Sequence, residues 1–398
     1  MIHKLNPYTP GAGVTPRVLA GRQVILDAAQ DRIDAVENGY YARPVVYYGL
    51  RGVGKTVLLN VIEMMADNHN LYYKHIEVKE ENNFVKALAI ACNGFSKELS
   101  TKEKLRDKMS KLLSYTRGFV ATWNPEDKTF SLELKDQLPE MAMTGTGDLS
   151  NDFTELLVML GKCAKQAETA IIFFIDEIQY ADAGELEAVI TAAHRINQLQ
   201  LPVLFFCAGL KKILKEMGDA KSYSERLFEF IEVDSLPAEA AKDAIVGPAQ
   251  ELGVAYTEEA IQKILDVTKG YPYFIQEICS TIWENHTNTL IDLDAVSSNL
   301  EAANRKLDAG FFRVRYDRCT GTEKRFMAAM VRCGALPCTI ANVAVAMKRP
   351  AKSIATYRSQ LIHKGLIYAT NHGEIDFTVP QFDEFLRRTH GDFNDESE

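Results

Sequence analysis

The sequence lacks the segments that direct a chain into a membrane or out of the cell. None of its apolar runs is long enough to span a bilayer, and its N-terminus does not have the composition of a signal peptide. It also contains no repeat and no low-complexity tract. We therefore expect a globular, cytoplasmic protein that does not contact membranes.

Metal-binding patterns are missing too. The seven cysteines show no C-x-x-C spacing, and the eight histidines are scattered along the chain. A structural zinc site needs closely spaced ligands, so these residues do not predict one. Reduced thiols in the cytoplasm are the simplest interpretation.

Positive charge is scarce overall but concentrated in one region. The formal net charge is −9, yet residues 305–364 contain thirteen basic and three acidic residues, a balance of +10 that leaves −19 for the rest. With 398 residues, 46% of them hydrophobic and 25% charged, the chain should fold into two or three ordinary globular domains. The uneven charge indicates a basic module carried by an acidic remainder.

A glycine-rich turn stands between an apolar run and a helical pattern. GLRGVGKT, residues 49–56, fits the pattern G-x-x-x-x-G-K-[ST]. Glycines let the backbone approach an anion, the lysine reaches the β- and γ-phosphates of a nucleotide, and the threonine hydroxyl ligates Mg²⁺. A chance glycine turn is the alternative, but the flanking strand and helix patterns disfavour it. The expected nucleotide-binding residues are Gly49, Gly52, Val53, Gly54, Lys55, Thr56 and Val57.

A second motif predicts that the nucleotide is hydrolysed. AIIFFIDEIQY ends a buried apolar run in Asp176 and Glu177. Asp176 would hold Mg²⁺, and Glu177 would orient or activate the attacking water. The alternative is that the two carboxylates are solvated residues at the end of an ordinary strand. The presence of both motifs in one chain disfavours this alternative. Because about 120 residues separate the motifs, we expect an insertion around residues 81–146.

Strand and helix patterns alternate through the N-terminal half of the chain. This order predicts an α/β fold, a P-loop NTPase parallel sheet with helices on both faces. We expect residues 1–21, which are rich in proline and glycine, to lie extended over the surface. In the insertion we expect helices over 82–98 and 101–114, followed by a hairpin in FVATWNPEDKTFSLEL. The expected strands lie at 42–48, 71–79, 170–176 and 202–209, and the expected helices at 22–37, 56–66, 151–167 and 184–198.

Helices alone follow the predicted sheet. We interpret 1–235 as the ATPase core and 236–305 as an all-helical lid, with a cap at Thr257. Residues 306–390 show three helices, at 321–333, 339–347 and 351–364, and then two alternating strands around Asn-His-Gly. That order is typical of a winged-helix domain, and residues 391–398 form an acidic tail.

The third of these helices is amphipathic. Ile354, Ala355, Leu361 and Ile362 form an apolar arc into which Arg358 projects, opposite Lys352, Ser353, Thr356, Ser359, Gln360 and His363. A polar face of this kind can contact base edges of double-stranded DNA, while nearby cations contact phosphates. Packing against protein is the alternative use of such a domain. The expected DNA-contacting residues are Arg349, Lys352, Ser353, Thr356 and Gln360.

The motifs and their order resemble a known family. LAGR (19–22), GLRGVGKT, FFIDEIQ, FFCAGL, SYSERLF (222–228) and KGYPYFIQ (269–276), followed by the winged-helix pattern, are similar to AAA+ and STAND-type P-loop ATPases related to the archaeal and bacterial origin-recognition initiators. The resemblance implies that Arg22 lies near the adenine. It implies that Arg226 is an arginine finger acting on its own or a neighbouring subunit's γ-phosphate, with a surface pair to Glu225 or Glu229 as the alternative. Gly270-Tyr271-Pro272 resembles the glycine-x-proline element of STAND switches, which places Pro272 beside the nucleotide.

Two functions fit these expectations. In the first, an ATPase with ATP and Mg²⁺ as cofactors acts as a nucleotide-gated switch that binds double-stranded DNA through its winged helix. In the second, a signalling or assembly switch contacts a protein partner through that domain. The strand at 202–209 ends in Cys-Ala-Gly, where many AAA+ members carry a polar sensor, so we expect slow hydrolysis. Self-association is compatible with both.

Overall fold

The computed structural model describes residues 5–79, 84–99, 123–124, 129–130, 148–371 and 373–390. Two compact units make up the chain, and each is described by itself. The sheet unit comprises Arg22–Gly49 and Lys55–Val233. The helical unit comprises Met1–Gly21, Leu50–Gly54 and Asp234–Glu398.

The sheet unit is built on five parallel strands in the order β2-β5-β6-β1-β7. Ile175 lies opposite Cys207 in the register of β5 and β6, so these strands end side by side. The four strands predicted from apolar runs are confirmed, whereas β7 was missed because Glu-Phe-Ile-Glu contains no such run. The strands are β1 (Val45–Tyr48), β2 (Tyr72–Glu77), β5 (Ile171–Asp176), β6 (Val203–Gly209) and β7 (Glu229–Glu232).

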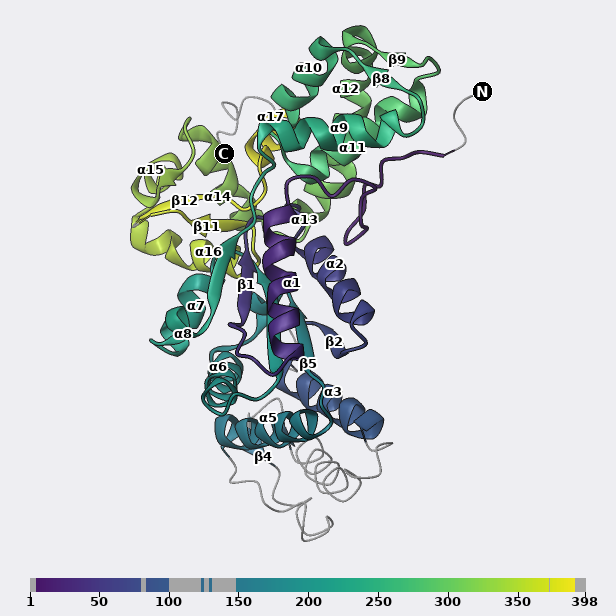
Figure 1. Ribbon diagram of the computed structural model, residues 1–398. Helices are drawn as coiled ribbons and strands as arrows, with labels where there is room; N and C mark the ends of the chain where they lie inside the picture. Colours follow the sequence, from purple (N-terminus) through teal and green to yellow (C-terminus); the bar gives the residue numbers. More distant parts are fainter. Residues whose placement is uncertain are drawn as a thin grey trace. The chain divides into compact units, whose positions relative to one another are not determined.

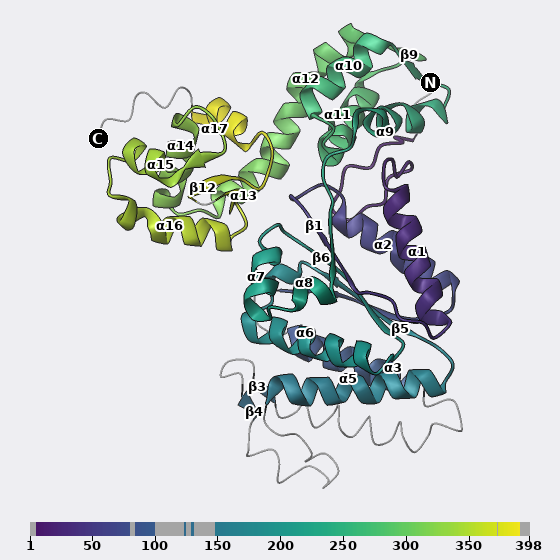
Figure 2. The ribbon, with the colours of Figure 1, turned by 60° about the vertical axis from the view of Figure 1, so that its left-hand side comes forward.

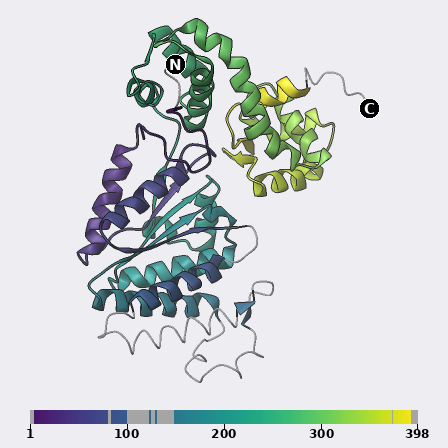
Figure 3. The same ribbon diagram turned by 90° about the vertical axis from the view of Figure 1, so that its right-hand side faces the viewer.

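Helices cover both faces of this sheet, as predicted. In Figures 2 and 3, α1 and α2 lie on one face, and α3, α5 and α6 lie on the other. Figure 1 shows α1 beside α2. The bounds are α1 (Gln23–Glu37), α2 (Lys55–Asn68), α3 (Phe84–Leu99), α5 (Leu149–Gln166) and α6 (Ala183–Gln198), with the short α7 (Ile213–Ala220) and α8 (Ser224–Leu227) after β6.

Stacked aromatic rings hold β5 and β6 together. The ring centroids of Phe173 and Phe205 are 5.3 Å apart, and those of Phe174 and Phe206 are 5.6 Å apart. Successive strand residues point to opposite faces, so each face receives one pair. Full burial of a phenylalanine contributes about 1.5–3 kcal/mol, and all four rings are buried. The strand ends that carry Asp176 and Gly209 are therefore firmly held.

Only part of the predicted insertion falls within the described residues. Helix α3 agrees with the helix predicted at 82–98. The strands β3 (Trp123–Asn124) and β4 (Thr129–Phe130) pair antiparallel, as the hairpin prediction requires. The helix predicted at 101–114 lies outside the described residues.

The helical unit begins with a segment that differs from prediction. Residues 5–21 form no helix or strand, but they do not simply lie on the surface. The Tyr8 side chain is buried, and its hydroxyl donates to the Ile245 carbonyl at 2.5 Å and lies 2.9 Å from the Tyr256 hydroxyl. A single aromatic residue in a proline- and glycine-rich segment carries no periodicity, so the sequence did not reveal this anchor.

Four helices follow in the helical unit. They are α9 (Ala238–Gln250), α10 (Glu258–Thr268), α11 (Pro272–Asn285) and α12 (Leu293–Leu307), accompanied by a short parallel pair, β8 (Ala255–Tyr256) and β9 (Leu290–Ile291). The predicted cap is present, because the Thr257 hydroxyl accepts from the Ala260 amide at 3.3 Å. Gly270 has φ +72°, and a Cβ there would lie 2.4 Å from the Leu236 carbonyl oxygen, so only glycine fits this turn.

A π-helical turn, η5 (Asp308–Phe312), and α13 (Arg313–Asp317) lead to the C-terminal module, residues 321–390. Three helices followed by a hairpin are present as predicted, with a third strand and a last helix in addition. The strands form an antiparallel sheet in the order β10-β12-β11. The elements are α14 (Gly321–Arg332), β10 (Cys338–Thr339), α15 (Ile340–Ala346), α16 (Ala351–His363), β11 (Ile367–Ala369), β12 (Glu374–Phe377) and α17 (Phe382–His390).

Two observations concern the expected environment of the chain. Within the described ranges, no helix combines the length and apolarity needed to cross a bilayer. All seven cysteines lie in the described part of the chain and carry free thiols.

Candidate nucleotide-binding site

The loop from Gly49 to Gly54 joins β1 to the first turn of α2. The Gly49 amide donates to the Gly209 carbonyl at 3.2 Å, which ties the start of the loop to β6. Gly52 and Gly54 have φ +82° and +94°, values that side-chain-bearing residues rarely adopt. Helix α2 then begins at Lys55, and the first amides of a helix, which have no acceptor within the helix, can bind an anion.

Lys55 is held at the mouth of this loop. Its side chain is buried, and the Nζ donates to the Gly49 carbonyl at 3.2 Å. A buried ammonium is costly unless it has partners. Phosphate oxygens are partners of the right charge for it.

The two sequence motifs meet at Thr56 and Asp176. The Thr56 hydroxyl donates to Asp176 Oδ2 at 2.6 Å, although the residues are 120 positions apart. Burial raises the pKa of Asp176, while the Thr56 hydrogen bond and the Lys55 charge oppose that shift. A hydroxyl and a carboxylate that converge are hard oxygen donors of the kind Mg²⁺ prefers, so the residues fit this ion.

Glu177 follows in a strained conformation. Its φ of 54° lies in the left-handed region, and its amide donates to Asp176 Oδ1 at 2.8 Å. Non-glycine residues in this region cluster at functional sites, because the surrounding structure must offset the strain. The side chain is half-buried, and its Oε2 accepts from Nε2 of Gln179.

Gln179 is a site residue that sequence reasoning missed. It is 2% exposed, and its Oε1 accepts from the Leu210 amide at 2.9 Å. A Cβ on Gly209 would lie 2.9 Å from this oxygen, so glycine at the end of β6 makes room for the amide. The signal was present: β6 ends without a polar side chain, and a glutamine follows the acidic pair. Gln179 thus places a polar side chain, from the turn after β5, next to the end of β6.

We expect Gln179→Ala to lower kcat for ATP hydrolysis by about 10- to 100-fold with little change in KM, because Glu177 loses the amide that orients it. Steady-state kinetics measures both constants. The matched control is Gln198→Ala, an exposed glutamine at the end of α6. Loss of kcat in both variants, or a change in KM alone, would contradict a positioning role for Gln179.

The other expected nucleotide contacts lie on several elements. Val53 and Val57 are buried. Arg22 immediately precedes α1 and is also buried. Arg226 is exposed on α8. In the described part of the chain no ion pair includes Arg226, and the Glu229 carboxylate binds Arg32 instead.

Pro272 is the first residue of α11 in the helical unit. The fixed φ of proline suits the first position of a helix, so helix geometry alone can explain a proline here, apart from any contact with a nucleotide.

The predicted polar face of α16 is exposed. Arg349 precedes the helix, and it is exposed together with Lys352, Ser353, Thr356 and Gln360. Ile354 and Leu361 are fully buried and Ile362 is partly buried, as the apolar arc predicts. Ala355 is exposed, contrary to prediction, because it lies at the edge of the arc where a small side chain does not reach the core.

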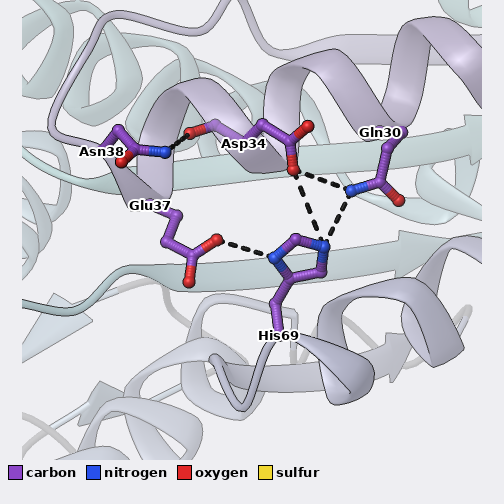
Figure 4. Close-up of polar contacts among 5 residues, drawn as sticks. All are labelled: Gln30, Asp34, Glu37, Asn38 and His69. Atoms are coloured by element: carbon purple, nitrogen blue, oxygen red, sulfur yellow. Dashed lines mark hydrogen bonds and ion pairs between the residues drawn. The ribbon is translucent and has the colours of Figure 1, made fainter.

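A separate polar cluster joins α1 to the end of α2 (Figure 4). His69 Nδ1 lies 2.6 Å from Glu37 Oε2, and His69 Nε2 lies 3.6 Å from Asp34 Oδ1 and 2.8 Å from Gln30 Nε2. Among the described residues this is the one histidine–carboxylate group compact enough for a metal ion. The two carboxylates face different ring nitrogens, so the imidazole acts as a bridge between them rather than as a ligand beside them.

Comparison with known proteins finds a family match for much of the N-terminal half of the chain. Residues 18–206 match the AAA ATPase domain family. This segment is similar to AAA ATPase domains. Both motifs, Gly49–Thr56 and Asp176–Glu177, lie within the matched residues. Residues 309–386 match a domain of unknown function (DUF8462). No curated protein matches the chain.

Several solved structures are also similar to this chain. The Walker-type ATPase PABY2304 of Pyrococcus abyssi has a TM-score of 0.52 and 15% identity, with 97% of this chain and 100% of that chain covered. Orc1 of Aeropyrum pernix in complex with DNA has a TM-score of 0.46 and 14% identity, with 94% of each chain covered. The RuvB Holliday junction branch migration motor of Thermotoga maritima has a TM-score of 0.45 and 14% identity, with 94% of this chain and 99% of that chain covered. At 15% identity, the similarity to PABY2304 shows a shared fold and nothing more.

Proposed function

We propose that the protein is an ATP-binding, slowly hydrolysing AAA+/STAND-type ATPase that acts as a nucleotide-gated switch and binds double-stranded DNA through a C-terminal winged helix. The observation that carries the ATPase part is the 2.6 Å hydrogen bond between Thr56 and Asp176, with Glu177 next in the chain. It brings together an anion-binding helix start, a cation-binding oxygen pair and a carboxylate able to act on water.

Each residue has a proposed role at this site. Lys55 and the loop amides bind the phosphates, Thr56 and Asp176 hold Mg²⁺, and Glu177 orients the attacking water. Arg22 lies near the adenine, and Pro272 contributes to nucleotide binding. Arg226, exposed and outside the ion pairs of the described residues, acts as an arginine finger in its own subunit or in a neighbouring copy. Slow turnover follows from β6, whose end has no polar side chain of its own.

We take the domains as 1–235 for the ATPase core, 236–305 for the lid and 306–390 for the winged helix, with an acidic tail at 391–398. The three helices and hairpin of the C-terminal module support the last assignment. DNA binding is supported by the balance of +10 over residues 305–364 and by the exposed face of α16.

A specific observation favours the alternative, a protein-contacting switch. Several basic residues of 305–364 are already paired with acids of the same unit: Lys364 with Glu323 at 2.7 Å, Lys306 with Glu284 at 2.6 Å and Lys324 with Asp317 at 3.6 Å. These residues would contribute little to a DNA-binding surface. In the described residues no ion pair includes Arg349 or Lys352, so the DNA proposal depends on these two.

The deciding experiment is duplex DNA binding over a salt series with ATP, with ADP and without nucleotide. We expect affinity to fall steeply with salt and to differ between ATP and ADP. Because each phosphate contact contributes about 0.9 to the slope of log K against log salt, the double variant Arg349→Gln/Lys352→Gln should reduce that slope by about two. Lys215→Gln, an exposed lysine on α7, is the control. Binding that ignores salt, nucleotide and the double variant would favour the protein partner.

A further inference from the structure

Helix α8, which carries Arg226, is too short to be stable by itself. It consists of one turn of four residues, Ser224–Leu227, and isolated helices of that length do not persist in water. Its position therefore depends on contacts with the rest of the sheet unit. Ser224 and Leu227 are buried, and the helix packs on α6 and α7 (Figure 2). Arg226 is exposed.

Arg43 binds the end of this helix from a distant part of the sequence. Its Nη2 donates to the Glu225 carbonyl at 2.7 Å and to the Phe228 carbonyl at 2.5 Å. Carbonyls at the end of a helix have no donor within the helix, and an arginine side chain can satisfy them. The two carbonyls lie on either side of Arg226 in the chain. Arg43 therefore fixes the piece of backbone from which Arg226 projects.

Strand pairing places Arg43 beside α8. Strands β1 and β7 are parallel neighbours, with Val45 opposite Glu229, and the Glu229 amide donates to the Pro44 carbonyl at 2.8 Å. Arg43 comes two residues before β1 begins, and α8 ends two residues before β7 begins. The sheet itself thus brings the guanidinium to the helix, so the contact does not depend on a flexible loop.

The acidic residues nearby leave both arginines to these tasks. The Glu229 carboxylate binds Arg32 of α1, and no ion pair within the described ranges includes Arg226 or Arg43. Arg43 instead forms hydrogen bonds to backbone carbonyls, and bonds from a guanidinium are charge-assisted and stronger than those between neutral groups. An exposed guanidinium on a fixed backbone, with no carboxylate paired to it, suits contact with a phosphate.

We propose that Arg43 is a positioning residue for ATP hydrolysis, which fixes α8 so that the Arg226 guanidinium meets the γ-phosphate in one orientation. This inference rests on the proposed ATPase function and on Arg226 as its arginine finger. A finger stabilises the charge of the phosphoryl group in the transition state, so its misplacement lowers kcat. Nucleotide binding by the phosphate loop is not affected, because Arg43 acts through Arg226 alone.

The test is a double-mutant cycle on ATP hydrolysis by the full chain at one protein concentration, with phosphate release from radiolabelled ATP to resolve slow turnover. Arg226→Ala is expected to lower kcat by at least about 100-fold. Arg43→Ala should lower kcat about five- to fiftyfold and change KM less than about twofold, because only the orientation of the finger is lost. In the Arg226→Ala background, Arg43→Ala should change kcat less than about twofold, because the residue that it positions is gone.

Two further variants separate positioning from a general effect on the fold. Arg43→Lys keeps a cation able to donate to both carbonyls, so it should lose only about two- to fivefold in kcat. If Arg43→Ala does not fold, the cycle is run with Arg43→Lys, whose smaller loss should also vanish in the Arg226→Ala background. The matched control is Arg195→Ala on α6, an exposed arginine whose Nη1 donates to Gln198 at 3.1 Å. It should hydrolyse ATP at the wild-type rate.

The outcomes distinguish this inference from the proposals beneath it. If the substitution of Arg43 lowers kcat equally with and without Arg226, the residue supports the fold and its positioning role is overturned, while the ATPase proposal stands. If Arg226→Ala keeps the wild-type rate while Glu177→Gln is inactive, the finger and the role of Arg43 both fall. If the wild type neither binds nor hydrolyses ATP, the proposed function itself fails.

Discussion

Replacing Glu177 with Gln is expected to lower the rate of ATP hydrolysis by about 100- to 10,000-fold while ATP binding is retained. Glu177 follows Asp176 directly, and its carboxylate accepts a hydrogen bond from Gln179, so it is the group that we propose as the acceptor of a proton from water. Glutamine keeps the size and the hydrogen-bonding geometry but is not a base. Phosphate release under single-turnover conditions measures the rate, and nucleotide titration measures the binding.

The control for this prediction is Glu187→Gln on α6, whose carboxylate pairs with Lys221 at 2.7 Å near the surface. It should hydrolyse ATP at the wild-type rate. If Glu177→Gln retains more than about a tenth of the wild-type rate, the catalytic assignment is wrong. If it loses ATP binding as well, the residue is needed for the structure of the site rather than for chemistry.

Lys55→Ala is expected to reduce ATP affinity by at least about 30-fold. Removing one partner of a buried, hydrogen-bonded charge pair typically costs 2–5 kcal/mol, and every 1.4 kcal/mol is a factor of ten. ADP affinity should fall too, because the ammonium also reaches the β-phosphate. Isothermal titration calorimetry with each nucleotide measures both losses.

Lys215→Ala removes an exposed lysine and controls for the change in net charge. The melting temperature of Lys55→Ala without nucleotide is measured as well, so that a loss of nucleotide binding is distinguished from a loss of folding. Nucleotide binding equal to that of the wild type would show that the loop does not serve the triphosphate, and the proposed function would fall.

The sheet could be predicted because its strands are buried on both faces. Runs such as Ile-Ile-Phe-Phe-Ile leave no other assignment, and short motifs at the ends of two such runs also gave the positions of Lys55, Thr56, Asp176 and Glu177. Strand β7 could not be predicted, because an edge strand with glutamate at both ends has no apolar run. Pairing of β7 with β1 is decided by tertiary contacts rather than by local preference.

The parts of the site that depend on side-chain direction could not be predicted. Gln179 reaches Leu210 only because β5 and β6 are neighbours in register, and no spacing in the sequence states that.

The left-handed backbone of Glu177 has a consequence for how this protein changes over generations. A side chain in that conformation carries a cost of roughly 1–2 kcal/mol that glycine would not carry. Glycine at this position would make the fold more stable and remove the base in a single substitution. A substitution that inactivates the protein would thus also stabilise its fold, and only selection for ATP turnover keeps a carboxylate at this position.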